Sequence, residues 1–178
     1  MKEWNSIIEM LCSLNNYKCN TMVLRNYELF SNNKLISLHE DIDMLCDDSD
    51  MVINALSATC RINDSDKIHL NVLIAGALVP LDLRVVGDSY YDEQWENDLL
   101  KRRVITKEGY YIPNPIDYIY SLMYHGLFHK SELKKEYVDR ILLLAEESGL
   151  EIKKEDFPIM LKDYMNKNGY VDTGYRCR

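Results

Sequence analysis

Two aspartates, one residue apart, stand inside a short apolar run of this sequence, His39-Glu40-Asp41-Ile42-Asp43-Met44-Leu45-Cys46. Side chains alternate between the two faces of a strand, so an extended run would point Asp41 and Asp43 to the same side. Their Cα atoms would then be about 7 Å apart. Carboxylates this close repel each other unless a cation lies between them, and such oxygen ligands suit Mg²⁺. The alternative is a strand end whose aspartates are solvated.

A third carboxylate stands alone in a second apolar stretch. Residues 67–74 and 78–86 are rich in β-forming residues, and Ala75-Gly76-Ala77 between them predicts a hairpin turn. Asp82 lies in the second strand between two leucines, where burial is unfavourable unless the carboxylate is paired or bound to a metal. A neighbouring strand that brought Asp82 beside the first two aspartates would complete a site for two divalent ions about 4 Å apart, the arrangement used for in-line attack at phosphorus.

Length and composition favour one compact domain, because the chain has 178 residues and is 47% hydrophobic. The formal net charge of −8 argues against a general nucleic-acid surface, which needs a basic face to displace counterions. The five cysteines show no C-x-x-C spacing, which is typical of a reducing compartment rather than of a disulfide scaffold or a zinc site. No apolar run approaches membrane-spanning length. We therefore expect a cytoplasmic protein without membrane insertion.

The predicted elements alternate at first and become helical toward the C-terminus, which indicates an α+β fold. A frayed tail is expected over residues 170–178. The expected strands outside the hairpin are 21–24, 39–46, 103–106 and 110–112, and the expected helices are 3–15, 51–56, 90–103, 114–128, 131–147 and 156–167.

The helix over residues 114–128 carries Tyr118, Leu122, His125 and His129 on one stripe, with Lys130 beside them. The two histidines have the spacing of a zinc helix, but the glutamate of H-E-x-x-H is missing, so a metalloprotease is excluded. They form either a buried pair or a stripe that faces an active cleft. The basic run at residues 101–103 has two readings as well, a solvated helix end or a phosphate contact.

The acidic pattern resembles the nucleotidyltransferase superfamily of the DNA polymerase β type, whose motif is hydrophobic-Asp-hydrophobic-Asp/Glu followed by a third carboxylate. Arg25-Asn26-Tyr27 stands where that superfamily carries a Gly-Ser or Gly-Gly turn. Four segments are similar to small bacterial proteins of this fold, which are often associated with surface-polysaccharide synthesis, and distantly to the fukutin and choline-phosphotransferase group. These segments are residues 24–28, 39–43, 81–84 and 124–130.

The resemblance implies a minimal nucleotidyltransferase sheet, mixed and flanked by helices, in a catalytic core over residues 1–112, followed by a C-terminal helical bundle over residues 113–178. It implies Mg²⁺, or Mn²⁺, held by Asp41, Asp43 and Asp82, with Asp82 helping to deprotonate the attacking hydroxyl. The residues expected to bind the donor phosphates are Arg25, Asn26, Arg84, His125 and Lys130.

The expected reaction is the transfer of a nucleotidyl group from a nucleoside triphosphate to a small acceptor, with no part for polymeric nucleic acid. One alternative is a fukutin-like transferase that moves a phosphoalditol or phosphocholine from a CDP-linked donor. The same three carboxylates would serve it, so a donor screen separates the two. Another alternative is a non-catalytic nucleotide-binding or antitoxin-like module. No motif identifies the nucleobase, the acceptor or the oligomeric state.

Overall fold

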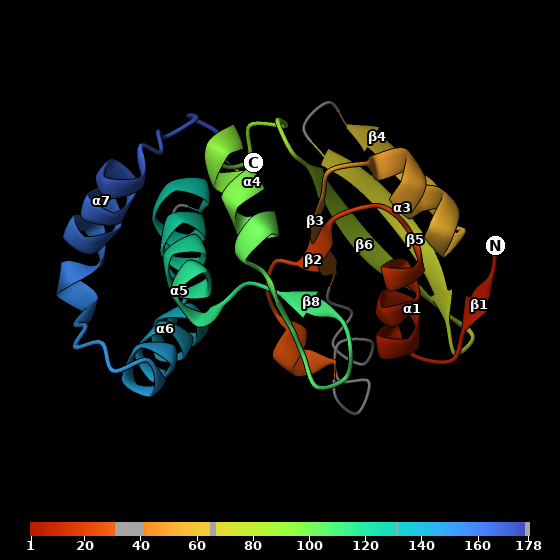
Figure 1. Cartoon of the computed structure of the whole chain (residues 1–178), viewed down its shortest axis with the longest axis horizontal. Coiled ribbons are helices and arrows are strands. Elements are labelled where there is room, and N and C mark those ends of the chain that lie inside the picture. The colour runs from red at the N-terminus through yellow and green to blue at the C-terminus, as the bar shows by residue number, and fades with distance from the viewer. Residues whose placement is uncertain (31–40, 65–66, 131, 177–178) are drawn as a thin grey trace.

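The computed structural model describes four stretches of the chain, residues 1–30, 41–64, 67–130 and 132–176. In these stretches a six-stranded mixed sheet is flanked by helices, which confirms the α+β class (Figure 1). The strands of the sheet are β1 (Glu3–Trp4), β2 (Thr21–Val23), β3 (Ile42–Cys46), β4 (Thr59–Asp64), β5 (Lys67–Ile74) and β6 (Ala77–Val85). A separate ribbon consists of β7 (Val104–Ile105) and β8 (Tyr111–Ile112).

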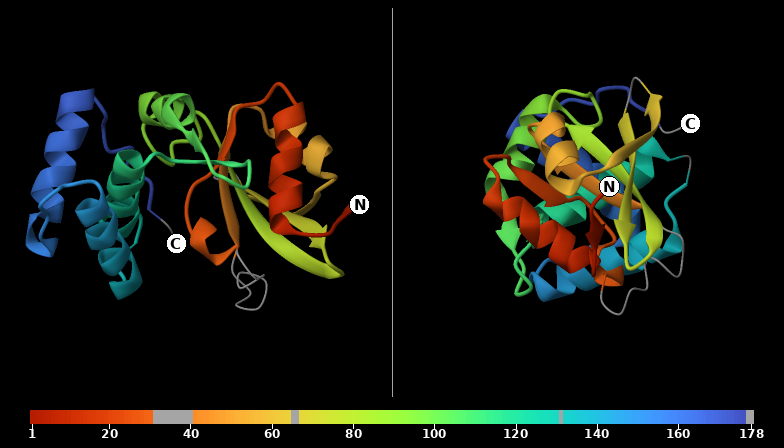
Figure 2. Two further views of the ribbon diagram at one scale, coloured as in Figure 1. Left: turned by 60° about the horizontal axis from the view of Figure 1, so that its bottom comes forward. Right: turned by 90° about the vertical axis from the view of Figure 1, so that its right-hand side faces the viewer.

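The helices lie on both sides of the sheet. Figure 2 shows α1 and α3 packed at one end of the molecule and α5, α6 and α7 at the other. The α-helices are α1 (Ile7–Ser13), α3 (Ser49–Leu56), α4 (Glu93–Arg102), α5 (Pro115–Tyr124), α6 (Lys135–Glu147) and α7 (Phe157–Asn168). The short helical turns are η1 (Leu14–Asn16), η2 (Tyr27–Leu29), η4 (His125–His129) and η5 (Lys154–Asp156).

The sheet has the order β1-β5-β6-β3-β2, and β4 pairs with β5 as well. The predicted hairpin is confirmed: β5 and β6 are antiparallel, and the turn residues Ala75 and Gly76 have φ angles of 47° and 78°. Positive φ at both positions is typical of the two-residue turns that match the twist of a hairpin. Strand β6 then pairs in parallel with β3, which sets Asp43 opposite Asp82.

Strand β3 divides its side chains between two hydrophobic clusters, as the alternating pattern predicts. Ile42 and Met44 belong to the cluster that includes α1 and α3, whereas Leu45 belongs to the cluster formed with α4, α5, α6 and α7. Because side chains alternate along a strand, Asp43 lies on the face of Leu45. The Asp43 carboxylate therefore faces the C-terminal helices.

Helix α5 begins as expected but ends earlier. The side chain of Asn114 accepts a hydrogen bond from the Asp117 backbone, with Pro115 in the first turn. The helix ends at Tyr124 rather than near residue 128, and a wider π-type turn, η4, continues to residue 129. At this turn the chain passes close to the segment that precedes α6: a Cβ on Gly126 would lie 1.9 Å from Leu133 Cδ1, so only glycine fits without a shift.

The predicted start of the first helix was wrong, and two strands were not predicted. Helix α1 begins at Ile7 rather than at residue 3, because Ser6 caps it by accepting a hydrogen bond from the Glu9 backbone at 3.1 Å. The preceding Glu3–Trp4 adds a short strand beside the end of β5. Strand β4 was not predicted at all. Of the expected strand 39–46, His39 and Glu40 lie outside the described residues.

Helix α6 runs from Lys135 to the expected end at Glu147, and Ser131, the first residue of its expected cap, lies outside the described residues. One prediction near the C-terminus was wrong. Residues 170–176 are anchored rather than frayed. Tyr170 is 4% exposed and stacks on Trp95 at 5.0 Å between ring centroids. Asp172 accepts a hydrogen bond from the Tyr124 hydroxyl at 2.9 Å. No helix in the described part of the chain is long and apolar enough to cross a membrane.

Candidate active site

One cavity of about 210 Å³ collects every residue that the sequence singled out for the site. These residues are Arg25, Asn26, Asp41, Asp43, Asp82, Arg84, His125 and Lys130. Three further residues line it that the sequence did not indicate, namely Tyr90, Lys134 and Tyr137. The cavity lies between the β3–β6 pair and the segment that joins α5 to α6, so segments distant in sequence build it together.

The three carboxylates come from two adjacent strands. Asp43 and Asp82 are partners in the parallel pairing of β3 with β6, and Asp41 directly precedes β3. Their side chains are largely shielded, with exposed fractions of 15% for Asp43 and 5% for Asp82. Among the described residues, no three potential ligands are arranged as they stand to hold a metal ion. The shared cavity agrees with the sequence, and the metal site itself stays a prediction.

Asp82 has two partners that the sequence analysis missed. His69 Nδ1 lies 2.8 Å from Asp82 Oδ1, and Arg61 Nη2 lies 3.7 Å from the same oxygen. A carboxylate oxygen only accepts, so His69 donates to Asp82 in the tautomer that carries its proton on Nδ1. Arg61 Nη2 also lies 3.2 Å from this nitrogen, so the three side chains form one cluster. Residue 69 stands opposite residue 82 in the hairpin. Counting outward from the Ala75-Gly76 turn would have identified this pair from the sequence.

Arg25 ties the first strand pair to the cavity. Its Nη2 donates to Asp43 Oδ1 at 2.6 Å, and its Nη1 donates to the Tyr90 hydroxyl at 2.7 Å. Burial alone would lower the pKa of Arg25, but the charge of Asp43 raises it well above the usual value. The next residue, Asn26, has a φ of 61°, a conformation that asparagine adopts more readily than most residues. Its side chain accepts from Arg140 at 3.0 Å.

Tyr90 and His125 line the cavity, and His129 packs against the Tyr90 ring. The Tyr90 hydroxyl lies 2.8 Å from His125 Nδ1, and His129 Nε2 donates to the Tyr90 carbonyl oxygen at 2.8 Å. Burial lowers the pKa of both histidines, with the nearby charge of Arg25 acting in the same direction, and the pKa of His129 falls to about 3. Both rings are therefore neutral at pH 7. Both histidines are buried, and their Nδ1 atoms lie 3.3 Å apart, so they form a buried pair. His125 also lines the cavity, so the stripe reaches it at one of the two histidines.

Four cationic side chains surround the carboxylates: Arg25, Arg84, Lys130 and Lys134. The basic run at residues 101–103 lies elsewhere. Arg102 makes two hydrogen bonds to Asp117, from Nε to Oδ2 at 2.9 Å and from Nη2 to Oδ1 at 2.8 Å. Its guanidinium thus joins α4 to α5 and is engaged by protein. The cations available to an anion in this cavity come from other segments.

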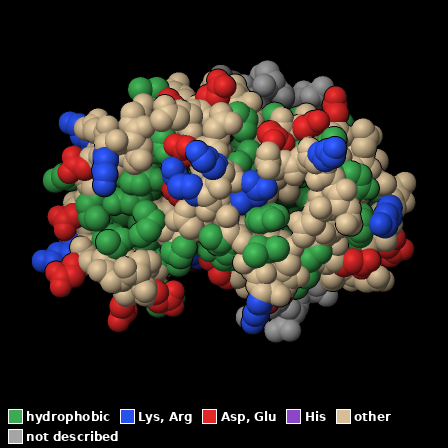
Figure 3. All heavy atoms as spheres, in the orientation of Figure 1, with side chains coloured by type: hydrophobic (Ala, Val, Ile, Leu, Met, Phe, Trp, Pro, Cys, Tyr) green, Lys and Arg blue, Asp and Glu red, His purple; other side chains and the backbone are tan. Residues whose placement is uncertain are grey.

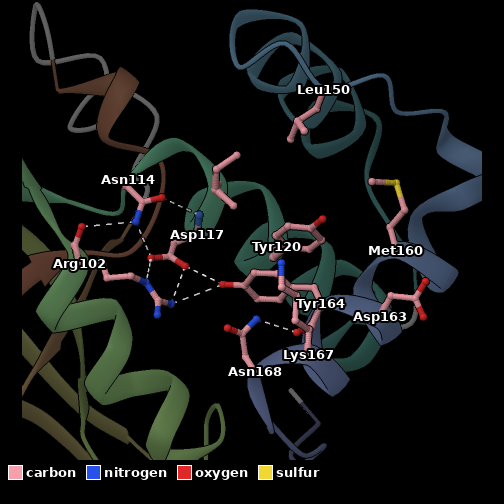
Figure 4. A pocket seen from close by; sticks show the side chains of 11 residues that line it. Arg102, Asn114, Asp117, Tyr120, Leu150, Met160, Asp163, Tyr164, Lys167 and Asn168 are labelled. Atoms are coloured by element: carbon pink, nitrogen blue, oxygen red, sulfur yellow. Dashed lines mark hydrogen bonds and ion pairs between the residues drawn. The ribbon is translucent and has the colours of Figure 1, made fainter.

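A larger cavity, about 580 Å³, lies between α5 and α7 (Figure 4). Its polar wall is the pair formed by Arg102 and Asp117, to which Tyr164 adds a hydrogen bond from its hydroxyl to Asp117 Oδ1 at 2.7 Å. These groups satisfy one another and connect three helices. We place the candidate active site in the smaller cavity because it gathers carboxylates, cations and a neutral histidine beside two adjacent strands.

The comparisons with known proteins support the fold. No model of a protein family matches the sequence, and no curated protein matches it. Among solved structures, the chain is similar to the solution structure of the antibiotic-resistance factor ANT(2'')-Ia, an aminoglycoside nucleotidyltransferase of the DNA polymerase β-like superfamily. The TM-score is 0.50 at 8% identity, over 90% of this chain and 89% of that chain. The nucleotidyltransferase fold expected from the acidic motif is therefore confirmed.

Proposed function

We propose that this protein transfers a nucleotidyl group from a nucleoside triphosphate to a small acceptor with the help of Mg²⁺ or Mn²⁺. One observation carries the proposal: Asp43 and Asp82 face each other on adjacent parallel strands, inside a cavity that four cations also line. Carboxylates suit a divalent cation and cations suit phosphates, so both halves of a metal-nucleotide complex find partners there. The nucleotidyltransferase fold supports the same reaction class.

The carboxylates fit the metal in type, since all three present hard oxygen atoms to one cavity. Asp41, Asp43 and Asp82 would hold it. When bound, the metal neutralises charge on the phosphates and favours ionisation of the acceptor hydroxyl. In the reaction, the acceptor oxygen forms a bond to the α-phosphorus and the bond to pyrophosphate breaks. The Asp82 carboxylate takes the acceptor proton, and His69 keeps that carboxylate in place at 2.8 Å.

The cationic residues would bind the donor's phosphates. Arg84 and Lys130 approach the cavity from β6 and from the end of η4, on two sides. Arg25 is paired with Asp43 and would offer its guanidinium to a phosphate once that carboxylate engages the metal. Asn26 and neutral His125 can donate hydrogen bonds without adding charge. In this proposal, these cationic and polar side chains bind the phosphates in place of the glycine turn that the nucleotidyltransferase superfamily carries.

The proposal is tested by measuring thermal unfolding with each nucleoside triphosphate and with CDP-linked donors, with and without Mg²⁺ or Mn²⁺. A donor at about 100 times its Kd should stabilise the protein by about 2.7 kcal/mol. Asp43→Asn and Asp82→Asn should abolish the effect of the metal, whereas Asp163→Asn, on the rim of the larger cavity, should retain it.

Binding of no triphosphate under any condition, or equal metal dependence in all three variants, would overturn the proposal. Stabilisation by CDP-linked donors alone would favour the fukutin-like reaction in place of nucleotidyl transfer. The role in surface-polysaccharide synthesis and the cytoplasmic location stay predictions.

A further inference from the structure

The C-terminal segment returns to the candidate active site. After α7 the chain runs back across the molecule toward α4 (Figure 1). There the Tyr175 hydroxyl accepts a hydrogen bond from Arg84 Nη2 at 2.7 Å. Arg84 lines the carboxylate cavity, whereas Tyr175 comes from a segment in which no sequence motif indicates a link to that cavity. The last described residues therefore contact a residue assigned to the donor phosphates.

The guanidinium of Arg84 lies against the rings of both Tyr175 and Tyr90, which contact each other edge to face at 5.4 Å between centroids. Arg84 Cζ lies 4.0 Å from the centroid of the Tyr90 ring and 4.8 Å from that of Tyr175. Cations are attracted to aromatic rings at this separation. Asp88 Oδ2, at 3.5 Å from Arg84 Nη1, adds an ion pair at the edge. Removing Tyr175 would take away one ring and one hydrogen bond while Tyr90 and Asp88 remained.

The turn that presents Tyr175 is itself held in place. Asp172 pairs with Arg176 at 2.8 Å and also accepts from the Tyr124 hydroxyl of α5. The hydrogen bond from Arg176 lowers the pKa of Asp172 to about 2, so the anchor stays ionised. Gly174 has a φ of 76°, and its backbone N–H donates to Asp172 Oδ1 at 3.0 Å. These contacts order residues 172–176, so the hydrogen bond between Tyr175 and Arg84 is part of the folded structure.

We propose that Tyr175 is a positioning residue, which holds the Arg84 guanidinium ready for the donor's phosphates. The inference rests on the proposed function, because it assumes that Arg84 binds a phosphate. A long side chain that is ordered before binding loses less conformational freedom when the ligand arrives. Loss of Tyr175 should therefore weaken donor binding and leave kcat nearly unchanged. Tyr175→Phe, which keeps the ring, should have a smaller effect than Tyr175→Ala.

A double-mutant cycle on phosphate binding tests this role. Isothermal calorimetry with inorganic triphosphate and Mg²⁺ removes any contribution of the nucleobase. Tyr175→Ala should raise the Kd about 3- to 10-fold, and it should have no further effect in Arg84→Ala, because Tyr175 acts through that residue. Tyr170→Phe is the matched control: it removes a hydroxyl from the same segment that bonds Asp98 at 2.7 Å, away from the cavity, and should leave the Kd unchanged.

Three results would overturn the inference while the proposed function stood. The Kd could be unchanged in Tyr175→Ala, or Tyr175→Ala and Arg84→Ala could raise the Kd independently, so that the double variant shows the product of the two increases. The third result is a rise in Kd in Tyr170→Phe equal to that in Tyr175→Ala. Failure of the wild type to bind triphosphate in any condition would overturn the proposed function and this role with it. Thermal unfolding of the same variants shows whether each is folded. If Tyr175→Ala unfolds at a much lower temperature than the wild type, Tyr175→Phe is used in its place. Its smaller rise in Kd must also disappear when Arg84→Ala is already present.

Discussion

At the scale of single residues, the surroundings of Asp82 decide how it can act. The carboxylate is nearly buried, which is unfavourable for a charge unless partners compensate, and His69 and Arg61 do so. These partners hold the carboxylate at one oxygen. A carboxylate that must accept a proton from a substrate needs such an orienting neighbour, as metal-site carboxylates and histidines commonly have.

The first prediction concerns His69. His69→Phe should reduce turnover about 10- to 100-fold, because Asp82 loses its hydrogen-bond donor, while the Kd of the donor nucleotide stays nearly the same. His69→Asn places an amide N–H near the position of Nδ1 and should recover much of the loss. The comparison is made by steady-state kinetics and calorimetry. A loss confined to nucleotide binding, or equal losses in both variants, would contradict an orienting role.

The second prediction concerns Lys130. Lys130→Ala should weaken donor binding about tenfold, or about 1.4 kcal/mol, because one cation is removed from the phosphate side of the cavity. Lys135→Ala is the control, since Lys135 is exposed in the first turn of α6 and does not line the cavity. Calorimetry with the preferred triphosphate measures both. An equal rise in Kd in the two variants would mean that Lys130 acts only through the net charge of the protein, without a direct contact to phosphate.

The site residues predicted from the sequence are those whose chemistry is local. Asp41, Asp43 and Asp82 stand out because a charged residue in an apolar run is unusual wherever the strand lies. Tyr90 and Tyr175 do not stand out, because the chain has 13 tyrosines and only tertiary contacts give these two a role.

At the scale of elements, a buried ion pair holds the helices around the larger cavity. Asp117 on α5 is 2% exposed and accepts from Arg102 of α4 and Tyr164 of α7 (Figure 4). The three helices therefore share one carboxylate. Their arrangement matters for the site, because α5 continues into η4, which carries His125 to the carboxylate cavity.

The third prediction tests this junction. Arg102→Ala should lower the free energy of unfolding by about 2 to 3 kcal/mol, because Asp117 would stay buried without its cation. This is less than the loss for a fully buried pair, since the Arg102 side chain is 36% exposed. Lys101→Ala, at the exposed neighbouring position, should change stability by less than about 0.5 kcal/mol. Urea unfolding of both variants makes the comparison, and similar losses would contradict the assigned role.

An element could be predicted from the sequence when the residues that stabilise it are close together in the chain. The hairpin of β5 and β6 was predicted because its turn and its strands are adjacent in sequence. Strand β4 was not predicted, although it forms a hairpin with the adjacent β5, because its sequence over Thr59–Asp64 is mostly polar. Strand β1 was not predicted because its partner β5 is far away in sequence. The same reason applies to residues 170–176, whose partners Trp95 and Tyr124 are far away in sequence.

At the scale of the whole molecule, the neutral histidines make stability depend on pH. His129 has a folded-state pKa of about 3, whereas an unfolded histidine titrates near 6.5. Between these values the unfolded chain binds a proton that the folded protein does not, so stability falls as the pH falls below about 7. Glu96, whose pKa burial raises to about 8, gives the opposite slope.

The fourth prediction isolates the histidine by difference. From about pH 7.5 to 5.5 the wild type should lose about 1.4 kcal/mol more unfolding free energy than His129→Gln, because the variant lacks the titrating ring. Glu96 is common to both proteins, so its contribution cancels. Urea unfolding at the two pH values gives the difference. Equal slopes would show that His129 is protonated as readily in the folded protein as in the unfolded chain.

The distribution of charge over the folded molecule indicates which partners it can bind. The sheet and the C-terminal helices are tied by the segment that brings Tyr175 back to Arg84. The division into units at residues 112 and 113 stays a prediction. Acidic and basic side chains are interspersed on the face shown in Figure 3, while hydrophobic side chains gather over the C-terminal helices. The cations that could meet phosphate line a small cavity instead of a long surface.

The last prediction is that the protein ignores polymeric nucleic acid. Each phosphate neutralised on a duplex needs a lysine or arginine, and a useful footprint takes several on one face. This chain has 21 basic against 29 acidic residues, and Arg102 of its densest basic run is already paired with Asp117. A small donor that carries its own metal ion brings less negative charge to this acidic protein than a polymer would. Fluorescence anisotropy with mixed-sequence duplex DNA and single-stranded RNA at about 150 mM salt should therefore show no micromolar binding. Micromolar affinity that decreases steeply with salt would instead indicate a nucleotidyltransferase that modifies RNA.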